Sequence, residues 1–242
     1  MTTSVAEQFT GLRPTPEIVI RPYTADEEYD RVIWHLQELE WLTANGYNVD
    51  LPDHPEFVKL TRPGADLSLL ESDTMRELFA REVYDPDAYV ERQRLIEADC
   101  PDIEQAIPVF LQLNERWGFK IYPKYEIVLT RYGTNGSYHP DTGRVVLSIH
   151  SPKRPRRTVI HEIAHLGVEK DLIKRFGLTH WEKERVIDHI CMQGCGHILT
   201  DYEFQDRGDE RLDSYIASAT INDLPTAIER YVADYHRMAK AE

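Results

Sequence analysis

The sequence predicts an α+β fold in which a small mixed sheet packs against helices. Two extended segments, residues 125–130 and 144–150, are rich in β-branched residues and are separated by a turn. On both sides of them, apolar residues recur every three or four positions, as expected for helices with one buried face. One apolar segment, residues 158–166, also contains polar side chains that are costly to bury without partners. Strands and helices therefore occupy different parts of the chain, as in the α+β class.

The length and composition predict one folded domain. The chain has 242 residues, of which 41% are hydrophobic, and this is enough for a sizeable core. We expect residues 1–16 to form a flexible N-terminal tail and residues 17–242 to form a single domain. Within that domain, we expect an α/β lobe at residues 17–170 and a helical C-terminal lobe at residues 171–242.

The charge and the hydrophobic pattern argue against several classes of protein. A net charge of −14 disfavours binding to nucleic acid, which requires a basic surface. No apolar run is long enough to cross a membrane, and the first residues lack the apolar stretch of an ordinary secretory signal. We therefore expect a cytoplasmic protein, or one exported without a standard signal peptide. The three cysteines do not suggest a disulfide framework.

The first elements are predicted from local signals. Residues 17–21 are expected to form a short strand. A helix should begin after Thr24, which is a suitable N-cap, and run to about Ala44, where Asn45 and Gly46 end it. Residues 47–75 are rich in Pro and Asp, and the sequence does not assign them to a particular element.

The middle of the chain changes from helical to extended. A mainly helical stretch is expected at residues 87–116, with a break around Pro101. Strands follow at residues 125–130 and 144–150, and a turn is expected between them at residues 138–143, which have Pro and Asp early and Gly late.

The next helix contains the pattern His161-Glu162-x-x-His165. Residues four apart lie on one face of a helix, so the two imidazoles point the same way. This pattern is typical of two histidines that bind one zinc ion, with the glutamate as general base on a water at the metal. The alternative is a structural helix with satisfied histidines, but the apolar neighbours would make that burial costly.

A catalytic zinc site needs a third protein ligand. The best candidate is Glu184, which lies in a second helix that begins near Thr179. Asp188 follows four residues later on the same face and could accept the other ring N–H of a ligating histidine. His180, at the start of that helix, is an alternative ligand. Glu182 is a weaker one, because its partner four residues later is a valine.

The pair His161-Glu162-x-x-His165 and Glu184-x-x-x-Asp188 resembles the gluzincin class of zinc metallopeptidases, over about residues 125–199. The resemblance implies a zincin-like metallopeptidase domain, in which a small mixed sheet with an antiparallel edge strand packs on the active-site helix. It implies that His161, His165 and Glu184 bind Zn²⁺ and that Asp188 supports His161. It also implies that the segment from Arg144 to Ile149 is the edge strand, along which a protein or peptide substrate binds in extended form.

Other zinc families fit the sequence less well. The metzincin spacing would use Asp171 as the third ligand, but Val168 occupies the position of the required turn glycine. A peptide deformylase would need a ligand cysteine in a particular upstream segment, and Cys100 lacks that context.

We therefore expect a zinc metallopeptidase that hydrolyses peptide bonds, as an endopeptidase, with Glu162 as the general base. A donor to the oxyanion is also required, and the sequence leaves Tyr231, Tyr235, His236 and Tyr202 open. Two other functions remain: a non-proteolytic zinc-binding interaction domain of the same fold, or a zinc hydrolase of a small amide. The sequence predicts neither the oligomeric state nor the specificity.

Two further features have more than one interpretation. Four of the five residues at 153–157 are basic, and they form either a solvated loop or a positive rim that attracts acidic substrate segments. Cys191 and Cys195 lie on the same face as Asp188, where we expect them to pack as small apolar residues. The alternative is a second metal site with His189 and His197.

Overall fold

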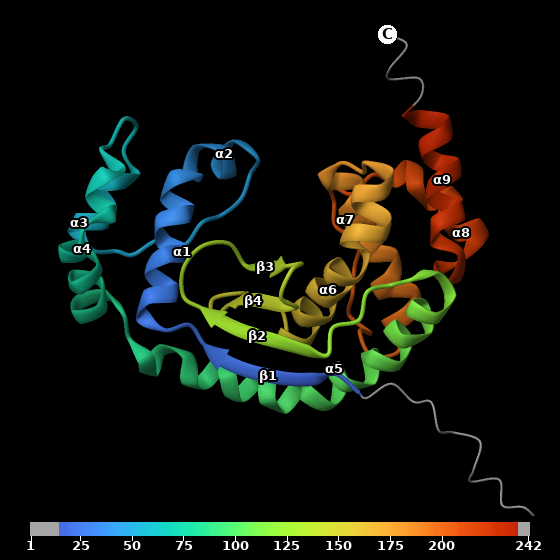
Figure 1. The fold of residues 1–242 in the computed structure, drawn as a ribbon, viewed down its shortest axis with the longest axis horizontal. Helices are drawn as coiled ribbons and strands as arrows, with labels where there is room; N and C mark the ends of the chain where they lie inside the picture. Colours follow the sequence, from blue (N-terminus) through green and yellow to red (C-terminus); the bar gives the residue numbers. More distant parts are fainter. Residues whose placement is uncertain (1–14, 237–242) are drawn as a thin grey trace, which may run out of the picture.

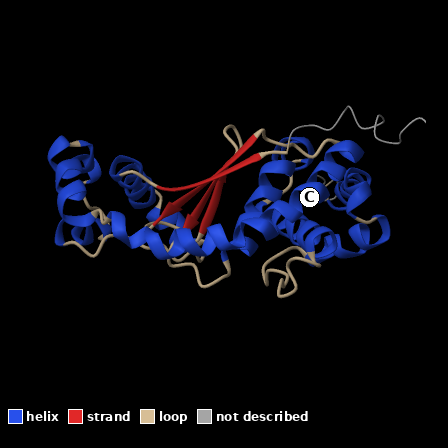
Figure 2. Cartoon of the chain, turned by 90° about the horizontal axis from the view of Figure 1, so that it is seen from below, coloured by secondary structure: helices blue, strands red, loops and turns tan. Residues whose placement is uncertain are grey.

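The computed structural model describes residues 15–236, and in this part of the chain helices surround one small sheet (Figure 1). The predicted N-terminal tail lies outside the described residues except for its last two. Seen from below, the sheet lies between two groups of helices, with one long helix running past it (Figure 2). The prediction of an α+β fold with a small mixed sheet is confirmed. None of the helices in the described part has the length and apolarity needed to span a bilayer.

The sheet has the strand order β1-β2-β4-β3. Strands β1, β2 and β4 run parallel to one another, and β3 runs antiparallel to β4. The central strands β2 and β4 are covered on both faces, which explains their nearly continuous apolar sequences. The strands are β1 (Glu17–Pro22), β2 (Lys124–Thr130), β3 (Gly136–His139) and β4 (Arg144–Ser148).

The predicted edge strand is wrong, because the segment from Arg144 to Ile149 contains β4, which is paired on both sides. The edge is β3, which overlaps the residues expected to form a turn. Since β2 and β4 are parallel, the chain must run back from the end of β2 to the start of β4. Strand β3 is part of this return, and for that reason it is antiparallel to β4. The tight turn is confined to residues 140–143. Gly136 and Ser137 have low β-propensity, so this strand has little local signal.

The N-terminal group of helices has its own small core. Thr24 and Glu27 form a capping box at the start of α1 (Ala25–Gln37), and a bend at Glu38 separates α1 from α2 (Leu39–Ala44). Gly46 follows with a φ of 78°, a left-handed conformation that favours glycine. Further short helices pack against α1: α3 (Pro55–Val58), η2 (Lys59–Thr61), η3 (Leu67–Glu71), α4 (Asp73–Leu78) and the π-helical turn η4 (Phe79–Val83).

After the short turn η5 (Pro86–Tyr89), a single helix, α5 (Val90–Trp117), runs along the sheet (Figure 1). The predicted break at Pro101 is wrong, since the helix continues through both Pro101 and Pro108. Both prolines are exposed, so water can satisfy the carbonyl groups that they leave without partners. The opposite face is buried in the main core, and this packing outweighs the local cost of proline.

The C-terminal part of the described chain is helical, as predicted. The helix with the two histidines, α6, is extended by the π-helical turn η6, and a capping box at Thr179 starts α7. Their bounds and those of the later elements are α6 (Pro155–Val168), η6 (Glu169–Lys174), α7 (His180–His189), η7 (Ile190–Gly194), η8 (Glu210–Leu212), α8 (Asp213–Ala219), η9 (Ile221–Asp223) and α9 (Leu224–Tyr235).

Gly167 allows α6 to approach the segment before β2. A Cβ atom at this position would overlap the ring of Phe119, which stacks on Phe110. The carbonyl oxygen of Gly167 also accepts a hydrogen bond from the backbone N–H of Lys120. The glycine therefore fixes how closely α6 lies against the core.

We predict that Gly167→Ala lowers the free energy of unfolding by about 1–3 kcal/mol, because an extra methyl group overpacks this contact. Alanine favours a helix over glycine by about 1 kcal/mol, so without the clash the same change would stabilise the protein. Urea unfolding measures the difference. Adding Phe119→Leu to the Gly167→Ala variant should recover part of the loss, and a stabilised single variant would contradict the prediction.

Candidate metal centre

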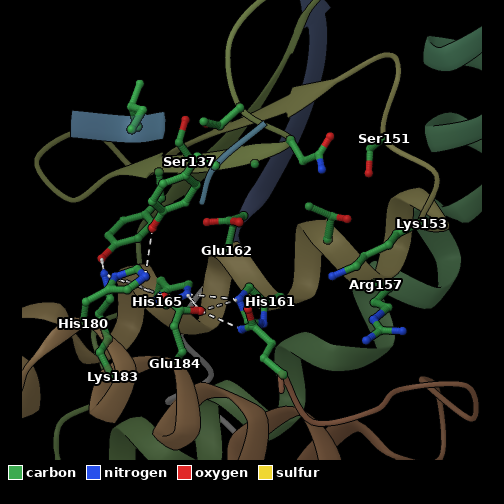
Figure 3. Close-up of a pocket in the computed structure, with 18 of the residues that line it drawn as sticks. Ser137, Ser151, Lys153, Arg157, His161, Glu162, His165, His180, Lys183 and Glu184 are labelled. Carbon is green, nitrogen blue, oxygen red and sulfur yellow. Dashed lines mark hydrogen bonds and ion pairs between the residues drawn. The ribbon is translucent and has the colours of Figure 1, made fainter. Parts of the chain in front are cut away.

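Three predicted ligands meet between α6 and α7 (Figure 3). The Nε2 atoms of His161 and His165 are 3.1 Å apart, and Oε2 of Glu184 is 3.3 Å from each of them. Ligand atoms about 2.05 Å from a tetrahedrally coordinated zinc ion lie roughly 3.3 Å from one another. The three atoms are therefore close enough together to hold one metal ion.

Helix geometry explains the meeting. His161 and His165 are one turn apart on α6, and the chain then reverses through Gly177, which has a φ of 65°. The returning helix α7 buries Val186 and Ile187 in the main core, and this places Glu184 opposite the two histidines. The local pattern predicted this geometry because both helices are regular around the three residues.

The hydrogen bonds of His161 leave a lone pair free for a metal. Tyr202 donates its hydroxyl proton to Asp188, at 2.8 Å, because an ionised carboxylate only accepts. The same hydroxyl oxygen therefore accepts from Nδ1 of His161, at 2.7 Å. When the imidazole is neutral, its proton is therefore on Nδ1, and its unprotonated Nε2 faces His165 and Glu184.

The expected support of His161 by Asp188 is thus indirect, because Tyr202 stands between them. Asp188 is fully buried and also accepts a hydrogen bond from the backbone N–H of Gln205. The side chain of Gln205 donates to Oε2 of Glu184 at 2.7 Å and orients that carboxylate. Sequence reasoning missed the roles of Tyr202 and Gln205, which lie in an irregular loop without periodic signal.

The electrostatics of the cluster favour a cation. Although burial opposes it, the two histidines hold the pKa of Glu184 well below its usual range. Burial lowers the pKa of His165 to about 4, so its imidazole is neutral at pH 7. Burial also acts to lower the pKa of His161, but the carboxylates of Glu184 and Glu162 raise it overall. Either a proton or a metal ion relieves the repulsion among the converging lone pairs.

The alternative ligands are not part of this cluster. Nδ1 of His180 is 3.8 Å from Oε1 of Glu184, and its Nε2 is hydrogen bonded to the hydroxyl of Tyr47. Asp171 lies in η6, away from the converging atoms. Among residues 15–236, no second group of His, Cys, Asp and Glu side chains is close enough to hold a metal, and Cys191 and Cys195 are buried in the main core.

Glu162 projects into the cavity beside the cluster (Figure 3). Its side chain makes no hydrogen bond or ion pair with any residue in the described part of the chain, although the residue is only 7% exposed. Burial raises its pKa to about 7. A Cβ atom on Gly136 would lie 2.6 Å from Oε1 of Glu162, so the glycine in β3 leaves room for the carboxylate.

The cavity has a volume of about 370 Å³ and is bounded by α6, α7, β3 and the N-terminal helices. Tyr138 of β3 stacks on the ring of His165, with centroids 4.8 Å apart. Its hydroxyl accepts from Lys183 and donates to Glu169. On the far side, Trp34 and Trp41 line the cavity although they are half exposed.

The start of β3 is held by α1. The guanidinium of Arg31 donates to the carbonyl oxygens of Tyr132 and Thr134 and to the hydroxyl of Ser137. Nε2 of His35 accepts from the backbone N–H of Thr134, and burial lowers the pKa of His35 to about 4, which keeps this nitrogen an acceptor. The N-terminal helices therefore position the strand that borders the metal centre.

Three of the four predicted oxyanion donors do not reach the cavity. Tyr231 and His236 both bind the carboxylate of Glu182, and Tyr235 packs against the ring of Tyr231. The fourth, Tyr202, lines the cavity, but its hydroxyl is already bonded to His161 and Asp188.

We predict that the protein binds one zinc ion and that Glu184→Gln weakens this binding by more than about 100-fold, because a ligand contributes more than the 10–100-fold of an outer partner. Competition with a chromogenic chelator measures the affinity. Asp171→Asn is the control and should bind zinc as the parent does. The reverse order of the two variants would contradict the assignment of Glu184.

We also predict that Tyr202→Phe weakens zinc binding by about 10–100-fold, since it breaks the chain of hydrogen bonds from His161 to Asp188. The matched control is Tyr231→Phe, which removes another buried tyrosine hydroxyl away from the cavity. Equal zinc affinities in the two variants would show that Tyr202 does not orient His161.

Comparisons of the chain with protein-family models, with curated proteins and with solved structures found no match in any of the three.

Proposed function

We propose that this chain is a zinc metallopeptidase with a zincin-like fold, and that it cleaves peptide bonds within extended segments. The observation that carries the proposal is the juxtaposition of the three candidate ligands with a carboxylate that has no hydrogen-bond or ion-pair partner among residues 15–236. His161, His165 and Glu184 converge on one side of the cavity, and Glu162 enters the same cavity beside them.

The donor set supports zinc as the metal. Two imidazoles and one carboxylate are the protein ligands of a known type of catalytic zinc site, which keeps a fourth position open. A bound zinc ion supplies Lewis acidity, which acidifies water and polarises a carbonyl group. The hydrogen bonds from Tyr202 and Gln205 keep His161 and Glu184 in ligating orientations.

Glu162 is proposed as the general base. Its carboxylate makes no hydrogen bond to any described residue, and burial raises its pKa to about 7, so it can accept a proton from water and return it to the leaving amine. Gly136 keeps the space in which the carboxylate lies.

The edge strand β3 supports an extended peptide as the substrate. It is bonded to β4 on one side only and contributes Gly136, Ser137 and Tyr138 to the cavity. An extended peptide can add to such an edge through backbone hydrogen bonds. This proposal replaces the segment from Arg144 to Ile149 with residues 136–139.

A donor for the oxyanion is proposed on the side of the cavity nearest Glu184. Tyr47 and His180 line the cavity there and are hydrogen bonded to each other, at 2.9 Å. Lys183 also lines the cavity, with its Nζ 4.0 Å from Oε1 of Glu184. Each of these groups can donate a hydrogen bond to developing negative charge.

A zinc hydrolase of a small amide is the second candidate. The observation that favours it is a link between the two sides of the cavity: Tyr47 binds His180, and Arg207 donates to the backbone carbonyl of Asn45 at 2.8 Å. Such a link narrows the opening and suits a smaller substrate.

We predict that the zinc-loaded protein cleaves members of a peptide library and that Glu162→Gln lowers kcat by at least about 100-fold with zinc still bound. Mass spectrometry of the products measures cleavage, and metal analysis measures zinc. Glu229→Gln, at an exposed position on α9, is the control.

Unchanged cleavage by the Glu162→Gln variant would overturn the proposed mechanism. Zinc binding without cleavage of any peptide would favour hydrolysis of a small amide, which a panel of N-acyl amino acids tests. Inactivity on both panels would leave a zinc-binding interaction domain.

A further inference from the structure

The four basic residues at positions 153–157 form two groups, which differ in whether a carboxylate lies close to them. Arg156 forms an ion pair with Asp102 at 3.0 Å, and Arg154 lies 3.9 Å from the carboxylate of Asp201. In contrast, Lys153 and Arg157 form no ion pair with any residue in the described part of the chain. Half of the run is therefore neutralised and half is not.

The two unpaired cations are the ones that face the active-site cavity. Lys153 and Arg157 line both that cavity and a neighbouring one of about 420 Å³, whereas Arg154 and Arg156 line neither. In Figure 3 their side chains lie on one side of Glu162, and His180 and Lys183 lie on the other. Among the described residues, these two cations therefore lie beside the cavity without a carboxylate in an ion pair.

Arg157 is held in place by neutral groups. Its guanidinium donates to the backbone carbonyl oxygens of Asp201 and Glu203 and lies 4.6 Å from the ring centroid of Tyr202. These contacts fix the orientation of the side chain but leave its charge uncompensated. The guanidinium is therefore preorganised for an anion.

A buried hydroxyl without a partner lies in the same wall. Thr158 lines the active-site cavity, is 8% exposed, and its Oγ1 has no hydrogen-bond partner in the described part of the chain. Buried polar atoms usually have partners, so this exception points to a ligand. Oγ1 has less than 1 Å² of accessible surface, so it reaches a ligand in the cavity only after rotation of the side chain about χ1. A hydroxyl donor together with an ammonium and a guanidinium matches the acceptor oxygens of a carboxylate.

We propose that Lys153, Arg157 and Thr158 bind a carboxylate group of the substrate. The inference rests on the proposed peptidase function and deepens it, because in a peptide the anionic group available is a carboxylate. The substrates are then acidic peptides. The carboxylate comes either from an Asp or Glu side chain or from the C-terminus, and the bond to be cleaved lies near it.

Binding to the Glu162→Gln variant of the full chain tests the proposal without cleavage. The probes are hexapeptide pools that carry an uncharged BODIPY dye at the N-terminus and contain no Asp or Glu at the random positions. Four pools are compared: one fixed position is either Glu or Gln, and the C-terminus of each is either a free carboxylate or an amide. Fluorescence polarisation gives the affinity, with zinc and after its removal by a chelator. A preference for Glu identifies a side chain as the source, and a preference for the free acid identifies the C-terminus.

We expect Lys153→Gln to weaken binding of the preferred carboxylate pool by about tenfold, the size of one charge-assisted hydrogen bond, and to leave the neutral pool unchanged. Arg157→Gln should have the same effect, and Arg157→Lys should restore part of it. The matched controls are Arg154→Gln and Arg156→Gln, from the same run, which should bind all pools as the parent does.

Equal binding of the carboxylate and neutral pools by the parent would overturn the inference. It would also be overturned if the parent prefers a carboxylate, Lys153→Gln keeps this preference, and removal of zinc abolishes it. Failure of the peptidase proposal has a different signature. In that case the zinc-loaded wild type cleaves no pool, while selective binding that depends on Lys153 and Arg157 remains.

Discussion

Three electron-rich atoms meet in a buried site, and much of the surrounding fold keeps them together. The lone pairs of two imidazoles and one carboxylate converge within 3.3 Å of one another, although they repel in the absence of a positive charge. The packing of α7 against α6 holds them in place, and Tyr202 and Gln205 fix two of the three groups by hydrogen bonds. A metal ion would turn this repulsion into coordination, so binding of the metal and stability of the fold are thermodynamically linked.

The charges around this centre are arranged unevenly. On one side of Glu162, Lys183 is engaged by Tyr138 and Glu184. On the other side, Lys153 and Arg157 have no carboxylate partner in the described part of the chain. At one end of the cavity the described cation is therefore paired, and at the other end the two described cations are not. Such an arrangement would favour one orientation of an anionic ligand.

The parts of the site that lie on regular helices could be predicted from sequence. The spacing of His161, His165 and Glu184 translates directly into geometry, because helical periodicity and the N-cap at Thr179 are local properties. Tyr202 acquires its role only through an irregular loop. The edge strand around Gly136 was missed because its position depends on the pairing of β2 with β4.

The long helix α5 shows that a local signal can also predict a break that the fold does not have. Pro101 is a strong local signal for a break, yet α5 continues because its buried face packs along the main core. The α+β class followed from local patterns, whereas the order of the strands depended on contacts between distant segments. Contacts between distant segments produce no periodic pattern of residues that could be recognised in the sequence.

The bend between α1 and α2 has a consequence for motion. Arg31 and His35 of α1 hold the start of β3, whereas the segment from α2 to Tyr47 lies beyond the bend at Glu38, so this segment can move while α1 stays in place. It is joined to α7 and its following loop by the hydrogen bonds of Tyr47 and Arg207. Breaking two such bonds costs about 1–3 kcal/mol, which corresponds to an open form in roughly one molecule in six to one in 160. The entrance to the cavity would then open and close spontaneously, and a ligand of the cavity would enter during these brief openings.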